Sequence, residues 1–462
     1  PFVREAYLDA YKRFIAPSIE REIRNELTEK ADEQAIAIFG ENLRNLLLQP
    51  PLKGKIVLGF DPAYRTGCKL AVIDETGKVL AIEVIYPHKP APMNKRQAAG
   101  PALQRLINRY GVQMIAIGNG TASRESEQFV AEQLKQIDHE AFYVIVNEAG
   151  ASVYSASPIA RQEFPDLQVE ERSAISIGRR LQDPLAELVK IDPQSVGVGQ
   201  YQHDVSQKRL SDQLDFVVET AVNQVGVDVN TASPQLLQHV SGLNKTTAQN
   251  IVAYREENGS FTQRSQLKKV PRLGPKAYEQ AIGFLRIPGG KNILDNTGIH
   301  PESYTAAKEI LEVAGVKLTQ LGAQSAEAKE RLAQLNVADL SKQLAIGKET
   351  ITDILKSLMQ PGRDMRDEMP APLLRKDVLS MEDLKPGMEL MGTVRNVIDF
   401  GAFVDIGVKQ DGLVHLSKLS RNFVKHPKDV VAVGDIVTVW IEQVDTTKGR
   451  ISLTMVDPTH GK

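Results

Sequence analysis

The C-terminal part of the chain has the pattern that limits its fold most narrowly. Between residues 387 and 455, apolar and polar side chains alternate with a period of two, and glycines recur at even spacing. Such alternation places one row of side chains in a core and the other in solvent, as in a small antiparallel barrel. We therefore predict an all-β barrel over residues 386–456. The expected strands are 390–398, 402–406, 412–416, 436–444 and 451–455.

This segment resembles the OB-fold RNA-binding domain of the ribosomal protein S-one type, from the largest small-subunit ribosomal protein. The resemblance rests on residues 392–406 (GTVRNVIDFGAFVDI) and 411–417 (DGLVHLS). It implies that bases stack on flat side chains, each worth roughly 1–3 kcal/mol, while cations follow the phosphates. The alternative is that one or both phenylalanines fill the barrel core. The residues that the resemblance places on the binding face are Phe400, Phe403, His415, Asp445 and Arg450.

A short internal duplication lies in the centre of the chain. Residues 236–243 and the following helix 246–257 are echoed by residues 267–274 and the helix 276–285. The unit resembles the paired helix-hairpin-helix module of DNA-uptake and repair proteins, and we assign it to residues 230–290. That segment has eight Lys and Arg against three Glu, and backbone N–H groups at a helix start bind phosphate. Packing as a scaffold is the alternative. The expected contact residues are Gly242, Lys245, Gly274 and Lys276.

The first half of the chain predicts a mixed-sheet α/β domain over residues 53–190. Three strands in hairpin order are followed by alternating helices and strands. The start of this domain, residues 59–62 (GFDP), and residues 180–186 (RLQDPLA) resemble an RNase H-like domain of the YqgF kind. The expected strands are 56–60, 70–73, 79–85, 114–117 and 142–146.

Carboxylates in this domain suggest a metal-dependent nuclease site. A two-metal nuclease needs several carboxylates around ions roughly 4 Å apart. Against activity, Asn147 stands where relatives carry Asp, Pro184 adjoins the last acid, and residues 118–120 (GNG) supply none. A vestigial acidic pocket is therefore the alternative, and we expect no cofactor unless the site is active, when Mg²⁺ or Mn²⁺ would be required. The candidate catalytic residues and metal ligands are Asp61, Glu148 and Asp183.

Helical segments account for most of the remaining chain. Apolar residues recur every three to four positions near the N-terminus, which is typical of amphipathic helices. The fold class is therefore multidomain α and α/β with a C-terminal all-β barrel. The remaining predicted segments are a helical scaffold (1–52), connecting helices (191–229), a helical domain (291–360) and an exposed linker rich in proline and charge (361–385).

The composition limits the partners and the compartment. Lys+Arg total 56 and Asp+Glu 58, so a basic nucleic-acid footprint must be local. A single cysteine, Cys68, excludes an internal disulfide framework and a thiolate-rich zinc site, which favours the cytoplasm. No apolar run approaches the roughly 20 residues that span a bilayer, so we expect no membrane partner. Because the chain opens on Pro1 within a predicted helix, we expect further N-terminal sequence in the natural protein.

The order of these segments resembles the Tex family, bacterial transcription accessory proteins similar to the eukaryotic elongation factor suppressor of Ty six. The matching phrases are 148–157 (EAGASVYSAS), 179–189 (RRLQDPLAELV), 197–205 (GVGQYQHDV) and 295–304 (DNTGIHPESY). The resemblance implies a non-enzymatic scaffold that binds RNA, and also single-stranded DNA, and assists transcription. RNA polymerase and the ribosome are the further partners to consider. The rival function is a metal-dependent RNase H-like nuclease or resolvase.

Overall fold

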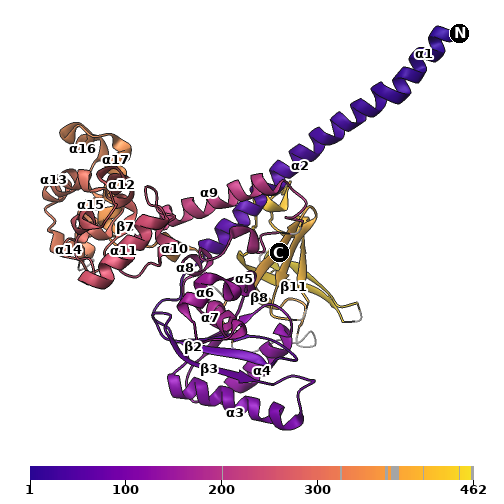
Figure 1. Cartoon of the computed structure of the whole chain (residues 1–462), viewed down its shortest axis with the longest axis horizontal. Coiled ribbons are helices and arrows are strands. Elements are labelled where there is room, and N and C mark those ends of the chain that lie inside the picture. The colour runs from indigo at the N-terminus through magenta and orange to yellow at the C-terminus, as the bar shows by residue number, and fades with distance from the viewer. Residues whose placement is uncertain are drawn as a thin grey trace.

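The computed structural model describes residues 1–199, 201–322, 325–369, 373–375, 384–408, 410–446 and 448–458. Figure 1 shows a long N-terminal helix projecting from the body, a sheet domain, a group of helices at the far end of α9, and a β barrel. The predicted fold class, multidomain α and α/β with an all-β barrel, is confirmed. No helix in the described part of the chain is long and apolar enough to cross a membrane.

The N-terminal rod is helical throughout, but only its second half is packed. Ile36, Phe39 and Leu43 are buried in a core that they share with α9, whereas Phe14 and Ile23 are exposed. Both halves show the amphipathic spacing, so burial here depends on which half meets a neighbour. The elements are α1 (Phe2–Ala10), the π-helical turn η1 (Tyr11–Ile15), α2 (Ala16–Leu47), η2 (Pro193–Ser195) and α9 (Gln207–Val225).

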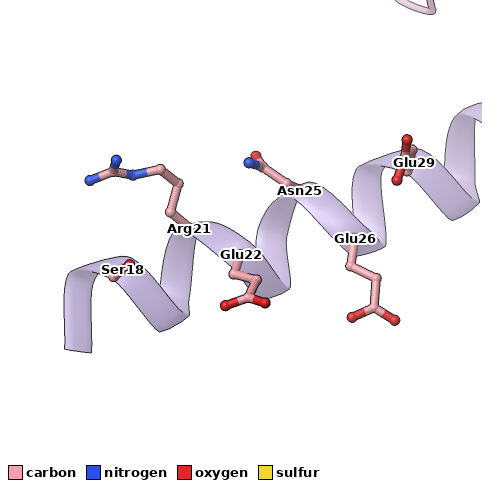
Figure 2. Close-up of a pocket in the computed structure, with 6 residues that line it drawn as sticks. All are labelled: Ser18, Arg21, Glu22, Asn25, Glu26 and Glu29. Carbon is pink, nitrogen blue, oxygen red and sulfur yellow. The ribbon is translucent and has the colours of Figure 1, made fainter. Parts of the chain in front are cut away.

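A shallow depression lies on the projecting part of α2. Figure 2 shows that all the labelled side chains around it come from this one helix. A depression without an opposing wall of protein gives a ligand little to bind, and we assign it no role. Its lining residues are Ser18, Arg21, Glu22, Asn25, Glu26 and Glu29.

The sheet domain has five strands in the order β3-β2-β1-β4-β5. β1, β2 and β3 pair antiparallel, while β4 and β5 run parallel to β1. On β1, Leu58 and Phe60 face a core formed with α3 and α4, and Val57 faces a second core formed with α7. Gly59 lets α7 lie directly on the strand, because a Cβ there would stand 2.0 Å from the Ala174 carbonyl oxygen. The elements are β1 (Val57–Asp61), β2 (Cys68–Ile73), β3 (Val79–Ile85), α3 (Met93–Tyr110), β4 (Met114–Gly118), α4 (Ser123–Leu134), β5 (Phe142–Val146), α5 (Ala151–Ala156), α6 (Pro158–Glu163), α7 (Val169–Gln182) and α8 (Pro184–Leu188).

The duplicated unit and the following helical domain are joined through one buried arginine. Arg264 is 1% exposed, and its guanidinium donates to the carbonyls of Leu285, Thr297 and Ile299. Its backbone N–H donates to the Asp295 carboxylate at 3.0 Å. The elements are β6 (Val227–Asp228), α10 (Pro234–Leu237), α11 (Lys245–Asn258), η3 (Arg264–Lys269), α12 (Pro275–Ala281), η4 (Ile282–Phe284), β7 (Leu285–Arg286), η5 (Ile293–Asn296), η6 (Pro301–Ser303), α13 (Tyr304–Ala314), α14 (Leu318–Gly322), α15 (Ala326–Ala333), α16 (Val337–Leu344) and α17 (Lys348–Met359).

The C-terminal strands close into a barrel in the order β10-β12-β11-β8-β9. Alternate residues such as Val394, Val404 and Val414 fill its core, as the period-two pattern predicts. The elements are β8 (Glu389–Ile398), β9 (Gly401–Asp405), β10 (Gly412–His415), η9 (Leu416–Lys418), η10 (Pro427–Asp429), β11 (Ile436–Asp445) and β12 (Arg450–Thr454).

Buried charges hold the barrel against the sheet domain. Arg375 forms an antiparallel bridge with Tyr143 on the edge strand β5, with N–H to carbonyl distances of 2.8 and 3.0 Å. The Arg375 guanidinium lies 3.6 Å from Glu127 of the sheet domain and 3.7 Å from Asp405 of the barrel. Arg395 donates to Asp405 at 2.6 Å. One cation from the connecting segment therefore faces an acid of each domain.

The prediction of an exposed linker over residues 361–385 is wrong for its first part. Residues 370–372 and 376–383 lie outside the described residues. Before them, η7 (Met365–Glu368) packs onto the body, with Arg366 only 3% exposed. Its charge is neutralised by Asp364 and Asp183 rather than by water. Part of the charged segment that we predicted to be exposed to solvent is therefore buried, at Asp364 and Arg366.

Candidate nucleic-acid interface

Phe403 lies on the outward face of the barrel, in the middle of β9. Its neighbours Ala402 and Val404 are buried, while Phe403 itself is half-buried on the other side of the strand. Its cross-strand partners are Asn396 on β8 and Leu413 on β10. A flat ring therefore stands on an open β surface, between side chains that point the same way.

Phe400 and His415 lie at one end of this face. Phe400 is 52% exposed, and its carbonyl accepts a hydrogen bond from the Leu416 N–H at 2.8 Å. His415 is exposed and pairs with Gly401, where a Cβ would meet the Val414 carbonyl oxygen at 2.2 Å. Glycine at 401 thus lets the two strands carry Phe400 and His415 close together.

A backbone contact orients the His415 ring. The Ser417 N–H donates to His415 Nδ1 at 3.3 Å, and the Ser417 hydroxyl lies 3.0 Å from the same nitrogen. Because Nδ1 accepts from a backbone donor, the neutral ring carries its proton on Nε2, which remains available as a donor.

Asp445 and Arg450 lie toward the other end of the face. They are opposite each other across β11 and β12, and Arg450 is exposed. β10 and β12 run parallel, and Leu413 on β10 pairs with Ser452 on β12. His415 lies two residues after Leu413, and Arg450 lies two residues before Ser452. His415 and Arg450 are therefore displaced in opposite directions along the strands. At about 3.3 Å per residue, the face extends about 13 Å from His415 to Arg450, with Phe403 between them. The five predicted residues therefore lie along one side of the barrel.

The first hairpin turn is closed by its own neighbours. Gly242 has φ +86°, but a Cβ there would lie 2.7 Å from Gln280 Cβ, so its backbone faces α12 rather than solvent. At the start of α11, Asn244 and Thr247 cap each other's backbone N–H groups. Lys245 is exposed beside this cap. We therefore place no phosphate contact on the Gly242 backbone.

The second hairpin turn is open. Gly274 is exposed, and a Cβ there would meet no atom within 4 Å. Lys276 is exposed one position into α12. Arg272, also exposed, adopts φ +64°, a left-handed conformation that costs a non-glycine residue roughly 1–2 kcal/mol. It occupies the position that Gly242 holds in the first hairpin, since both are followed by leucine. Sequence reasoning missed Arg272, although aligning the two repeats would have revealed it.

The three predicted catalytic carboxylates do not converge. Burial raises the pKa of Asp61 to about 6; a hydrogen bond from Ser173 opposes this rise, and the charge of Glu148 adds to it. Burial also raises the pKa of Glu148, whose Oε2 is buried without a hydrogen-bond partner in the described residues. Asp183 instead caps α8 and accepts from Arg366 at 2.7 Å. Because Asp183 is engaged by Arg366 and by the start of α8, the predicted set of Asp61, Glu148 and Asp183 does not fit Mg²⁺ or Mn²⁺ in this arrangement.

One other group has metal-ligand character among the described residues. Glu279, His300 and Glu302 lie within reach of a common point. However, His300 Nδ1 accepts from the Glu302 N–H, and Nε2 lies 2.9 Å from the Glu279 carbonyl oxygen. Both ring nitrogens are engaged, so the group is a helix cap rather than a metal centre.

Four family models match the chain. They are the Tex protein YqgF-like domain (residues 55–182), a helix-hairpin-helix motif (222–286), an HHH domain (292–366) and the S1 RNA binding domain (383–455). A Bacillus subtilis protein, YdcI, is 65% identical over 454 residues, which cover 98% of this chain and 63% of YdcI. The transcriptional accessory protein Tex of Neisseria gonorrhoeae is 50% identical over 455 residues, covering 98% of this chain and 59% of that protein. The chain belongs to the Tex family.

A human relative is more distant. S1 RNA-binding domain-containing protein 1 is 38% identical over 507 residues, covering 97% of this Tex-family chain and 50% of the human protein. The chain thus spans about three-fifths of the bacterial relatives and half of the human one. The domain matches confirm the YqgF-type, hairpin and S1-type domains of this Tex chain, and they add an HHH domain where only a helical domain was predicted.

Proposed function

We propose that this chain binds single-stranded nucleic acid, RNA above all, on the outward face of its barrel, and acts as a non-enzymatic accessory scaffold in transcription. The observation that carries the proposal is the outward position of Phe403, between the exposed residues Phe400 and His415 at one end and Arg450 at the other. The S1 RNA binding domain match and the name of the gonococcal relative support it.

The charge of the barrel segment favours stacking over bulk electrostatics. Residues 387–462 contain nine basic and nine acidic side chains. Without net positive charge, affinity comes from rings that contact bases, with a few cations on phosphates. We therefore expect a shallow dependence of affinity on salt concentration.

The Phe403→Ala variant tests the proposal directly. Stacking on one ring is worth roughly 1–3 kcal/mol, so affinity for a single-stranded RNA should fall about five- to 150-fold. Met391→Ala is a matched control, because Met391 is exposed on β8 where that strand pairs with β11. If Phe403→Ala binds single strands as well as the unchanged protein does, the stacking face is wrong.

The second hairpin supplies a further contact in this proposal. Open space at Gly274 and the exposed cations Arg272 and Lys276 suit a phosphate backbone, without reading bases. Single-stranded DNA is the second proposed ligand, since neither rings nor cations select a ribose. Matched RNA and DNA strands, single and double, titrated at two salt concentrations would separate stacking from phosphate contacts.

Docking to RNA polymerase or to the ribosome, in the cytoplasm, completes the proposal. The name of the gonococcal relative, transcriptional accessory protein, supports a role in transcription, and the single buried cysteine suits a reducing compartment. Pull-down before and after nuclease treatment distinguishes direct docking from tethering through nucleic acid.

The rival function is a nuclease that uses Asp61 and Glu148. Their proximity and raised pKa values favour a functional pocket. The Asp183–Arg366 ion pair opposes it. Cleavage of labelled RNA or branched DNA with Mg²⁺ or Mn²⁺, lost in Asp61→Ala, would establish the rival; no such product would remove it.

A further inference from the structure

Phe423 is the most exposed large apolar side chain in the described part of the chain, at 94%. It lies in the loop between η9 and η10. Leu419 and Pro427 are buried on either side of it, and Val424 packs against the barrel core. The loop is therefore anchored at several points. Val424, the next residue, packs against the barrel core. This contact fixes the backbone beside Phe423, so the exposure of the ring follows from an anchored loop.

Cations flank this ring in the sequence. Residues 416–428 include Lys418, Arg421, Lys425 and Lys428, and they include no Asp or Glu. Lys418 pairs with Glu442 at 2.5 Å. The other three are exposed and form no ion pair among the described residues. The barrel segment is neutral in total, so its positive charge is concentrated in the part of the sequence that carries this exposed ring.

The loop starts at the aromatic end of the stacking face. Leu416 directly follows His415, and its N–H donates to the Phe400 carbonyl. Ser417 contacts the His415 ring, and the Lys418 carbonyl accepts from the Met455 N–H at 2.9 Å. The chain therefore passes from the face into the loop through fixed contacts, so a strand that leaves the face at His415 meets the loop next.

We propose that residues 419–428, which we term the Phe423 loop, form a second stacking point that extends the single-strand path beyond the His415 end of the barrel face. The inference rests on the proposed function and adds a site to it. A base would lie on the Phe423 ring, and its flanking phosphates would contact Arg421 and Lys425.

A protein partner fits this loop less well than nucleic acid. Protein interfaces need a contiguous apolar centre with few charges, whereas Phe423 is a single ring among cations. Docking a protein here would remove Arg421 and Lys425 from water without supplying acids from this chain. A nucleic acid satisfies the ring and the cations together.

The experiment compares two oligouridylate RNAs, about four and about twelve nucleotides long, within the site sizes usual for OB folds. Phe423→Ala should weaken binding of the long strand about five- to a hundredfold and leave the short strand unchanged. Phe423→Trp should keep full affinity, while Phe423→Leu, which is apolar but not flat, should behave like Phe423→Ala. Phe216→Ala, which removes a ring 63% exposed on α9, is the control and should change neither.

The outcomes separate this inference from the proposed function. If Phe403→Ala weakens both strands and Phe423→Ala weakens neither, the Phe423 loop is overturned and the barrel face stands. If Phe423→Ala loses affinity and Phe423→Leu keeps full affinity, the inference is also overturned, because binding would then depend on a hydrophobic contact and not on stacking. If Phe403→Ala has no effect, the proposed function itself fails.

Discussion

Arg366 donates to the carboxylate of Asp183 at 2.7 Å, across 183 residues of sequence. The same guanidinium donates to Asp364 at 2.8 Å and is 3% exposed. This contact fastens the segment after α17 to the start of α8, and it withdraws Asp183 from the acidic pocket of the sheet domain. The Arg366 guanidinium thus links this segment to the sheet domain and engages the Asp183 carboxylate.

Replacing Arg366 with Met should destabilise the chain by up to about 3 kcal/mol, because Asp364 would lose its buried partner and keep only the more exposed Lys53, at 3.2 Å. Urea unfolding followed by circular dichroism measures the loss. Arg363→Met is the matched control: Arg363 pairs with Glu368 at the surface, where an ion pair is worth about 0–1 kcal/mol. Equal stability of the two variants would show that the Arg366 contacts contribute nothing.

Acid should weaken the same contact. Burial raises the pKa of Asp364, but the hydrogen bonds and charge of Arg366 outweigh burial and lower it to about 2. A carboxylate whose folded pKa is depressed stabilises the fold above its ordinary pKa and loses that contribution as pH falls. The unchanged protein should therefore lose stability between about pH 4 and pH 2 through this group. The Arg366→Met variant should lose less over that range, and parallel pH curves for the two proteins would contradict the assignment.

Asp61 should have the opposite pH dependence. Its folded pKa is raised to about 6, chiefly by burial, so the fold favours the protonated form. Stability from this group is complete below the ordinary pKa and falls as pH rises toward 6. Asp61→Asn should therefore stabilise the sheet domain at pH 8 by up to about 3 kcal/mol and have little effect at pH 4. Thermal unfolding at both pH values measures this, with the exposed Glu75→Gln as control. A loss of stability at pH 8 would mean that the carboxylate is needed by the fold.

Arg272→Gly should separate stability from binding. Glycine accepts φ +64° freely, so removing the strained residue should stabilise the hairpin by up to about 1 kcal/mol. Affinity for nucleic acid should fall, because an exposed cation beside the open Gly274 turn is lost. Lys276→Gln should weaken binding without the gain in stability. If Arg272→Gly is more stable and binds equally well, the left-handed arginine has no role in binding.

Local patterns were sufficient for much of this fold. The buried strands β1 and β4 are continuous apolar runs, and the barrel strands alternate, so both were predictable to within two residues. The partners of buried charges were not predictable, because residues such as Arg366 and Asp183 are far apart in the sequence. Helical spacing likewise could not distinguish Phe14, which is exposed, from Phe39, which is buried. The sequence also does not show whether a hairpin turn is open or closed. Gly274 lies in an open turn and Gly242 in a closed one, yet each appears in the sequence only as a glycine within a repeat.

The attachment of the barrel should depend on Asp405. This carboxylate is 2% exposed, and burial raises its pKa, but the charges of Arg375 and Arg395 outweigh burial and lower it. Asp405→Asn keeps the shape and the acceptor for the Gly407 N–H, yet removes the anion that faces the guanidinium groups of Arg124, Arg375 and Arg395. Arg124 and Arg375 would keep Glu127 but lose their ion pairs to the barrel, so the barrel should separate from the sheet domain more readily, at a cost below the roughly 3–5 kcal/mol of a fully unpaired buried charge.

Small-angle scattering should then show a larger radius of gyration, and proteolysis near residues 361–385 should be faster. Asp411→Asn is the control, since Asp411 is exposed and its own charge faces Asp405. Raising salt should not reproduce the effect in the unchanged protein, because the Asp405 and Glu127 carboxylates are shielded from solvent and screening acts mainly on exposed charges. Affinity of the Phe403 face should persist in Asp405→Asn, because the substitution keeps the size of the side chain and the acceptor for the Gly407 N–H. A variant as compact as the unchanged protein would mean that the Tyr143–Arg375 bridge holds the barrel without the ion pairs.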